Sequence, residues 1–211
     1  MRRHFLPVVA AALVLTSAGL LAATYTYTTV AGTAGTVVKS ADGAALEALF
    51  DSPRGVAVDA AGTTYVADSS NHTIRRITAA GVVSTLAGTP GASGYADGTG
   101  AAARFNEPFG IAVDTAGTLY VADTSNNAIR RITQAGVVTT LAGGPVAQAG
   151  PTDPTLGRLD EPRGVTVDAT GAVYVADYNN QLIRKITPSG TMTTLAGSLD
   201  VEGNADGTGA D

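Results

Sequence analysis

One sequence unit occurs three times in this chain, and its repetition limits the fold more than any single motif does. The copies occupy residues 53–88, 108–143 and 162–197. Their first residues, Pro53, Pro108 and Pro162, are separated by 55 and then 54 positions. A period of this length, with several short strand patterns in each copy, is typical of repeat architectures. The sequence therefore predicts an array of one small structural unit.

Each copy divides into four segments with strand character. In the second copy they are residues 110–114, 119–122, 128–132 and 137–141, which are rich in β-branched and aromatic residues. Glycine-containing turns and one polar connection separate them, and no long helical period follows the N-terminal leader. A four-stranded antiparallel sheet per repeat, stacked radially, is a β-propeller blade. The predicted fold class is all-β: three propeller blades forming part of a ring.

The two ends of the array carry incomplete repeats. Residues 24–31 alternate β-branched and aromatic side chains and end like the last strand of a copy, so they predict a leading strand. At the other end, residues 205–209 begin another linker before the sequence stops at Asp211. We expect the N-terminal part of a longer protein. The alternative is a three-blade chain that pairs with a copy of itself through its open blade edges.

Residues 1–23 form a leader. Arg2, Arg3 and His4 precede an apolar segment that ends in the small residues Ala22 and Ala23. This pattern predicts a signal peptide and a secreted or periplasmic protein without membrane contact after cleavage. An uncleaved membrane anchor is the alternative.

Charge and cysteine content exclude several classes of partner and site. The formal net charge is −5, and an acidic chain lacks the clustered Lys and Arg that bind nucleic acid phosphates. The chain has no cysteine, so disulfides, thiolate catalysis and zinc–cysteine sites are excluded. We therefore expect no nucleic acid partner.

The repeated motifs carry a family resemblance. Pro-x-Gly-Val/Ile-x-Val-Asp is followed by Tyr-Val-Ala-Asp-x-x-Asn, Ile-Arg-Arg/Lys-Ile and Leu-Ala-Gly, or close variants, in all three copies. These units resemble the NHL-repeat family of β-propellers, and the Ala-Asp-Gly-x-Gly linkers look like those of its bacterial secreted members. The resemblance implies a closed propeller, often six-bladed. Some propellers of related shape are metal-dependent lyases or lactonases, and some intracellular relatives bind RNA.

Three polar residues recur in every copy, and we interpret them as structural. The Asp-x-x-Asn pairs are predicted to shape the turn between the second and third strands, with Asn in a left-handed conformation; a calcium site is the alternative. Each Arg is predicted to form an ion pair with a repeated Asp, for which Asp59, Asp114 and Asp168 are candidates; anion binding is the alternative. The repeated positions are Asp68, Asn71, Arg75, Asp123, Asn126, Arg130, Asp177, Asn180 and Arg184.

The linkers contain a further repeated carboxylate, at Asp42, Asp97 and Asp206. Each is followed by glycine, which predicts a tight turn that needs a left-handed residue. Metal binding by the glycine-rich linker is the alternative. No cofactor is predicted, with calcium as the one metal considered.

Positions that differ between copies are the better candidates for ligand-binding residues, because residues repeated in every copy are explained by the structure of the blade. In a propeller, the linkers and the loops between the second and third strands share one face. The predicted binding residues on that face are Arg54, Phe109, Arg163, Glu107, Glu161, His72, Asn127 and Gln181. They predict a partner that is a protein, a peptide or a glycan.

Catalytic groups are scarce in the three copies. His72 is the single histidine after the leader, so a Ser-His-Asp triad or a histidine metal site around the channel has too few members. We predict no catalytic residue and a non-catalytic, exported binding scaffold. The alternative is the N-terminal part of a metal-dependent lyase or lactonase whose catalytic residues lie in further blades.

Overall fold

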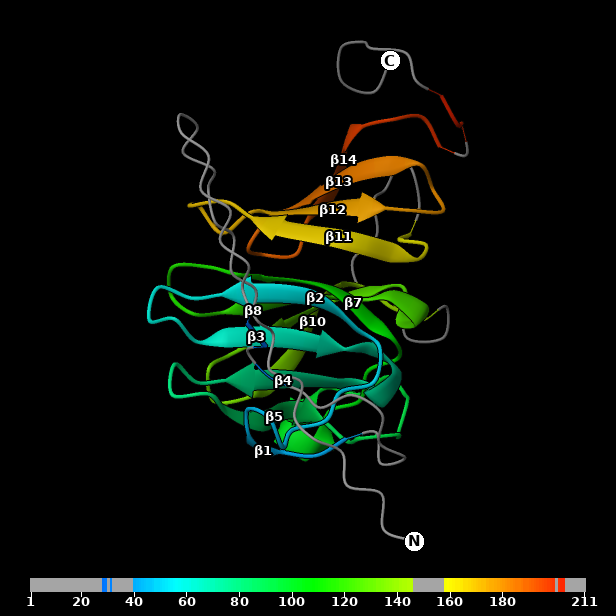
Figure 1. Ribbon diagram of the computed structural model, residues 1–211. Helices are drawn as coiled ribbons and strands as arrows, with labels where there is room; N and C mark the ends of the chain where they lie inside the picture. The colour runs from blue at the N-terminus through cyan, green and yellow to red at the C-terminus, as the bar shows by residue number, and fades with distance from the viewer. Residues whose placement is uncertain (1–27, 30, 32–39, 146–157, 200, 204–211) are drawn as a thin grey trace, which may run out of the picture.

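Three antiparallel sheets stand next to one another in the computed structural model, which describes residues 28–29, 31, 40–145, 158–199 and 201–203 (Figure 1). The first sheet is a meander of four consecutive strands, in which every neighbour in sequence is also a neighbour in the sheet. These strands are β2 (Pro53–Val58), β3 (Thr64–Asp68), β4 (Thr73–Ile77) and β5 (Val82–Gly88).

The other two sheets repeat the same meander. The second consists of β7 (Pro108–Val113), β8 (Leu119–Asp123), β9 (Ala128–Ile132) and β10 (Val137–Gly143). The third consists of β11 (Pro162–Val167), β12 (Val173–Asp177), β13 (Leu182–Ile186) and β14 (Met192–Ala196). Helical structure in the described residues is limited to the short 3₁₀ turns η1 (Ser69–Asn71), η2 (Gly100–Ala102) and η3 (Thr124–Asn126). The predicted all-β class, with four main antiparallel strands per repeat, is confirmed.

Two sheets have a fifth, two-residue strand that the sequence did not predict. β1 (Gly43–Ala44) pairs with β5, and β6 (Gly98–Thr99) pairs with β10. Both belong to the Ala-Asp-Gly linkers, which were expected to form tight turns. Instead each linker pairs with the outermost long strand of the blade that follows it, where backbone N–H and C=O groups would otherwise lack partners.

The core lies between neighbouring blades. The face of β8 and β7 that carries Val121 and Ile111 packs against Tyr65, Ile74 and Leu86 of the first blade. The opposite face of the second blade packs in the same manner against the third, through residues such as Tyr120, Ile129, Val173 and Ile186. The second blade therefore packs through both of its faces, which is possible because successive side chains of a strand point to opposite faces.

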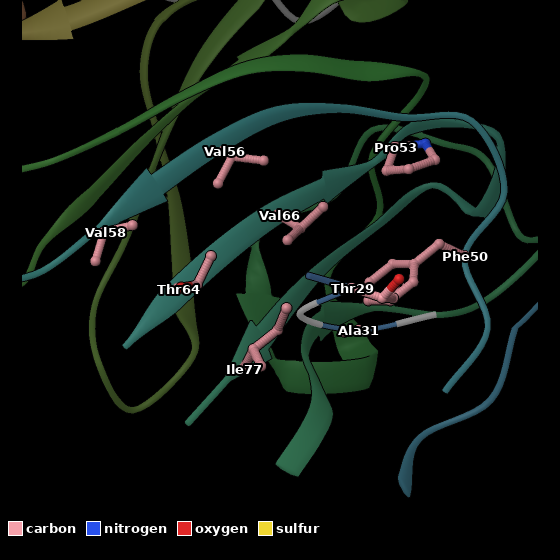
Figure 2. Close-up of a pocket in the computed structure, with 9 residues that line it drawn as sticks. All are labelled: Thr29, Ala31, Phe50, Pro53, Val56, Val58, Thr64, Val66 and Ile77. Carbon is pink, nitrogen blue, oxygen red and sulfur yellow. The ribbon is translucent and has the colours of Figure 1, made fainter. Parts of the chain in front are cut away.

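The outward face of the first blade is open to solvent. Val56 and Val58 on β2 are 60% and 56% exposed, although their counterparts Ile111 and Val113 are covered by the first blade. Together with Phe50, Val66 and Ile77 they line a hollow of about 470 Å³ (Figure 2). At the other end of the array, Ile183 and Leu195 of the third blade are 41% and 46% exposed.

Several predicted features lie wholly or partly outside the described residues. The leader, Asp206 and most of the third linker are outside them. Of the predicted leading strand, Thr28, Thr29 and Ala31 are described, and none of them belongs to a strand. Thr29 and Ala31 instead line the hollow on the first blade (Figure 2). In the described part of the chain, no helix has the length and apolar character needed to cross a membrane.

Candidate functional site

Close packing of the first strands brings three predicted binding residues into neighbouring positions. A Cβ atom on Gly55 would collide with the carbonyl oxygen of Phe109, and one on Gly110 would collide with the carbonyl oxygen of Arg163. Glycine in the Pro-x-Gly motif therefore allows β2, β7 and β11 to approach one another. The residue before each glycine then stands beside its counterpart in the next blade.

Those residues form a ladder of cations and aromatic rings. The guanidinium carbon of Arg54 lies 4.8 Å from the centre of the Phe109 ring, and that of Arg163 lies 5.9 Å from the same ring. Arg163 also lies over Tyr178, at 3.5 Å from its ring centre. Such contacts are attractive because the face of an aromatic ring is electronegative. We call Arg54, Phe109, Arg163 and Tyr178 the cation–aromatic ladder.

Tyr178 was missed by the sequence reasoning. It follows the repeated Asp177, at a position occupied by Ser69 and Thr124 in the other blades. Thr124 donates a hydrogen bond from its hydroxyl to the carbonyl oxygen of Pro162, at 2.7 Å, whereas Tyr178 is half exposed. The variation at this position would have identified it, because the other candidates were chosen by that criterion.

Two more predicted residues connect neighbouring blades. The Nδ1 atom of His72 accepts a hydrogen bond from the Glu107 N–H at 3.1 Å, and Asn127 Oδ1 accepts one from the Glu161 N–H at 2.8 Å. Their side chains are thus used in positioning the segments that enter β7 and β11. Gln181 occupies the equivalent place in the third blade and is exposed.

The charges around the ladder are unevenly paired. Arg163 forms an ion pair with Glu161 at 3.1 Å, with both side chains partly exposed. Glu107 accepts a hydrogen bond from the Ser125 hydroxyl at 3.3 Å. Arg54 is exposed, and no carboxylate of the described residues lies within ion-pair distance of it. The ladder therefore presents one unpaired guanidinium and one weakly paired one.

The repeated Arg residues form ion pairs with a repeated Asp, as predicted, but the candidate partners Asp59, Asp114 and Asp168 are wrong. Arg75, Arg130 and Arg184 are fully buried and pair with Asp68, Asp123 and Asp177, respectively. In the first blade the Nη1–Oδ2 distance is 2.8 Å. Val66 is the cross-strand partner of Arg75, so the side chain of Asp68, two residues further along β3, lies on the same face.

The candidate partner Asp59 closes the turn at the other end of the blade. Its Oδ1 accepts the N–H groups of Ala61 and Thr63 at 2.9 Å, and its Oδ2 accepts the hydroxyl of Tyr65 at 3.1 Å. Asp114 and Asp168 have the same hydrogen bonds in the second and third blades. These carboxylates stabilise the hairpin between the first and second strands instead of pairing with Arg.

The linker carboxylates also pair with the buried Arg residues. Asp42 Oδ1 lies 2.7 Å from Nη2 of Arg75, and its two oxygens accept the hydroxyl and the N–H of Thr85. Asp97 binds Arg130 and Thr140 in the same way. Both carboxylates therefore hold the linker on its blade, and the glycine that follows each has a positive φ, 149° at Gly43 and 155° at Gly98.

The Asp-x-x-Asn motif is only partly as predicted. Asp68 accepts the backbone N–H of Asp51 at 2.8 Å and the side-chain N–H of Asn71 at 2.8 Å. The left-handed residue is not Asn71 but the one that follows: φ is 56° at His72, 54° at Asn127 and 60° at Gln181. The Asn side chain donates a hydrogen bond to Asp, and the residue that follows it adopts the left-handed conformation.

Burial raises the pKa of the carboxyl groups that these motifs place inside. The pKa of Asp123 rises to about 6 because burial outweighs the opposing effects of Arg130 and of its hydrogen bonds. Burial also raises the pKa of Asp68 and Asp177. Among the described residues, no cluster of three or more His, Cys, Asp or Glu side chains could hold a metal ion.

Comparison with known proteins identifies the family. The teneurin NHL domain model matches residues 38–97 and 92–155, and the NHL repeat model matches residues 159–186. The chloroplastic protein SUPPRESSOR OF QUENCHING 1 of Arabidopsis thaliana is 42% identical over 92 residues, which cover 43% of this chain and 9% of that protein. Teneurin-3 of Danio rerio is 28% identical over 173 residues, covering 74% of this chain and 6% of that protein. The chain thus spans a small part of these relatives.

Solved structures share the fold at low sequence identity. An auxiliary nutrient binding protein of Bacteroides ovatus has a TM-score of 0.56 at 19% identity, covering 71% of this chain and 39% of that one. A chain of a nidogen/laminin complex has a TM-score of 0.51 at 23% identity, covering 69% of this chain and 48% of that one. A gluconolactonase of Xanthomonas campestris has a TM-score of 0.50 at 18% identity, covering 70% and 48%. The matched models together span more than half of the sequence, and the three meanders have the expected architecture, so the chain belongs to the NHL-repeat family of β-propellers.

Proposed function

We propose that this protein is an exported, non-catalytic β-propeller scaffold that binds a protein, peptide or glycan through its loop face. The loop face is the end of the blades that carries η1, η3, the turn after β12 and the segments entering β2, β7 and β11. The observation that carries the proposal is the cation–aromatic ladder, which crosses all three blades on that face. Arg, Tyr and Phe are enriched at the centres of protein interfaces. The fold shared with a nutrient binding protein and with a chain of a laminin complex agrees with a binding role.

Site-specific cross-linking tests this function. A photo-reactive amino acid replaces Tyr178 on the loop face, and in a matched variant it replaces Ala116, which is exposed in the turn at the other end of the second blade. Each chain is irradiated in culture medium and cell extract of the producing organism. We expect a discrete cross-linked product from position 178 and none from position 116. Equal products from both positions, or none from position 178, would contradict the proposal.

Export is tested separately from binding. The leader predicts a mature protein that begins near Thr24, outside the cytoplasm. N-terminal sequencing of the protein recovered from the periplasm or medium checks this prediction. A full-length chain found only in the cytoplasm would show that the leader is not an export signal.

The alternative function is a metal-dependent lyase or lactonase, whose fold a gluconolactonase shares. The described residues supply no carboxylate or imidazole cluster for such chemistry. A lactone hydrolysis assay with added divalent cations distinguishes the two functions. Measurable turnover would replace the binding role as the primary function.

A further inference from the structure

We propose that the cation–aromatic ladder binds the carboxylates of an acidic, extended segment of a partner protein, with Arg54 and Arg163 as the two anchoring residues. This inference rests on the proposed binding function of the loop face and specifies the chemistry of its ligand. Its starting point is the position of both guanidinium groups over Phe109, at 4.8 Å for Arg54 and 5.9 Å for Arg163, with Arg163 also over Tyr178.

A ring under a guanidinium group does not use its hydrogen-bonding edge, which meets no carboxylate of the described residues in Arg54 and is engaged through Nη2 with Glu161 in Arg163. The guanidinium group is planar, and its N–H donors lie in the plane, so a ring beneath the plane does not use them. The same stacking restricts the rotation of two long side chains before any ligand arrives. Binding then costs less side-chain entropy than it would with freely rotating Arg residues.

The pairing of charges on the ladder favours an anionic ligand. Arg54 is exposed and has no carboxylate of the described chain within ion-pair distance. The pair of Arg163 with Glu161 is partly exposed, at 37% and 44%, and such surface pairs contribute little free energy. An incoming carboxylate can form two parallel hydrogen bonds with a guanidinium edge, which is the stronger arrangement.

The spacing of the two anchors suits a peptide. Their guanidinium carbons lie 4.8 and 5.9 Å from the centre of the Phe109 ring, so they are separated by at most the sum of these distances. In an extended peptide, side chains on the same face repeat every ~7 Å. The spacing of acidic residues at alternate positions lies within this upper bound.

The ladder is less suited to a carbohydrate. Sugars in binding sites pack on the free faces of aromatic rings, whereas the guanidinium carbons of Arg54 and Arg163 both lie over the Phe109 ring, 4.8 and 5.9 Å from its centre.

The net charge of the chain does not prevent an anion from binding at the ladder. The charge of −5 repels anions at long range. Because physiological salt screens charges beyond ~8 Å, the nearby guanidinium groups determine binding at the ladder.

Calorimetric titration of the whole chain with defined peptides tests this inference. The probe is a blocked peptide of alternating Glu and Ser, and its control has Gln in place of Glu. We expect the Glu peptide to bind, and the Gln peptide to bind at least about tenfold more weakly. Affinity for the Glu peptide should fall as salt is raised.

Protein variants identify the anchors. R54A and R163A should each weaken binding of the Glu peptide by about tenfold, and R54K should also weaken it because an ammonium group lacks the planar fork. R131A removes an exposed Arg of the same charge from β9, outside the ladder, and should bind like the unaltered chain. Thermal unfolding of each variant confirms that it is folded.

Three outcomes would overturn the inference: no binding of the Glu peptide, equal binding of the Gln peptide, or unchanged affinity in both R54A and R163A. A parallel titration with polygalacturonate addresses the other source of carboxylates. Binding of that polysaccharide without binding of the peptide would also overturn it. If any of these outcomes occurs but a partner still cross-links at position 178, the carboxylate-binding inference is wrong and the proposed binding function is retained. Failure of the inference can thus be distinguished from failure of the proposed function.

Discussion

Arg130 and Asp123 form an ion pair in which both side chains are fully buried, with 2.7 Å between Nη1 and Oδ2. The same guanidinium group donates through Nη2 to the carbonyl oxygen of Ala96 and to Asp97 Oδ1, both at 2.7 Å. One side chain thus joins the end of β8 to the linker that covers the outer edge of the blade. The first blade repeats this arrangement with Arg75, Asp68 and Asp42.

The two carboxylates around Arg130 should differ in their contribution to stability. D123N removes the buried charge and leaves the guanidinium undercompensated, so we expect the free energy of unfolding to fall by about 3–5 kcal/mol. D97N removes the same charge from a half-exposed side chain and should cost about 1 kcal/mol or less. Urea unfolding of both variants checks the difference. Equal losses would show that burial does not determine the strength of this pair.

The glycines of the Pro-x-Gly motif should tolerate alanine unequally. G110A places a Cβ against the carbonyl oxygen of Arg163 and 3.1 Å from the Val165 nitrogen, so β7 and β11 must separate, at a cost of about 1–3 kcal/mol. In G164A the nearest atom is the Ala176 Cβ at 3.4 Å, an ordinary contact, so the change should stay within about 0.5 kcal/mol. Thermal unfolding compares the two. A larger loss in G164A would contradict the close packing of β7 on β11.

The open face of the first blade should make the isolated chain self-associate. A second copy can cover Val56 and Val58 with the exposed face of its third blade, where Ile183 and Leu195 lie, and so repeat the contact between neighbouring blades. The double substitution V56D/V58D should shift the chain towards the monomer in sedimentation velocity. V82D, at a valine that is also half exposed but does not line the hollow, is the control. Identical sedimentation of the three chains would exclude this mode of association.

Removing a hydroxyl from the turn around Asp168, or adding one to the equivalent turn around Asp59, should change the pKa of the carboxyl group in that turn. The hydrogen bond from the Thr170 hydroxyl, together with the other hydrogen bonds that Asp168 accepts, lowers the pKa of Asp168 to about 2. In the first blade, the residue equivalent to Thr170 is Ala61, two positions after Asp59. T170A should therefore raise the pKa of Asp168 towards its ordinary value, and A61T should lower that of Asp59 further. Carbon-detected NMR titration measures both.

The sign of the accompanying stability change follows from linkage. The pKa of Asp168 is lower in the folded chain than in the unfolded chain. Its contribution to stability is present above the unfolded pKa of about 3.9 and is lost as pH falls through about 2. T170A should remove part of this contribution at neutral pH. An unchanged Asp168 pKa in T170A would show that the hydroxyl is not responsible.

Local structure was largely predictable, as the second blade shows. The segment predicted at 119–122 is β8 (Leu119–Asp123), and that at 128–132 coincides with β9 (Ala128–Ile132). Alternation of side chains and glycine in turns are properties of neighbouring residues, so they can be recognised without knowing the fold. The variation between copies also placed Arg54, Phe109 and Arg163 among the binding candidates.

Contacts between distant segments could not be predicted in the same way. Asp42 and Arg75 are far apart in sequence, and only the path of the linker along β5 brings them together at 2.7 Å. The ladder likewise needs the approach of β2, β7 and β11, which depends on how the blades stack. The sequence alone determined the repeat, the strands and the positions that vary between copies. The tertiary structure decided which carboxylate meets each buried Arg and which rings lie under Arg54 and Arg163, because those energies depend on distance and burial between segments that no local pattern encodes.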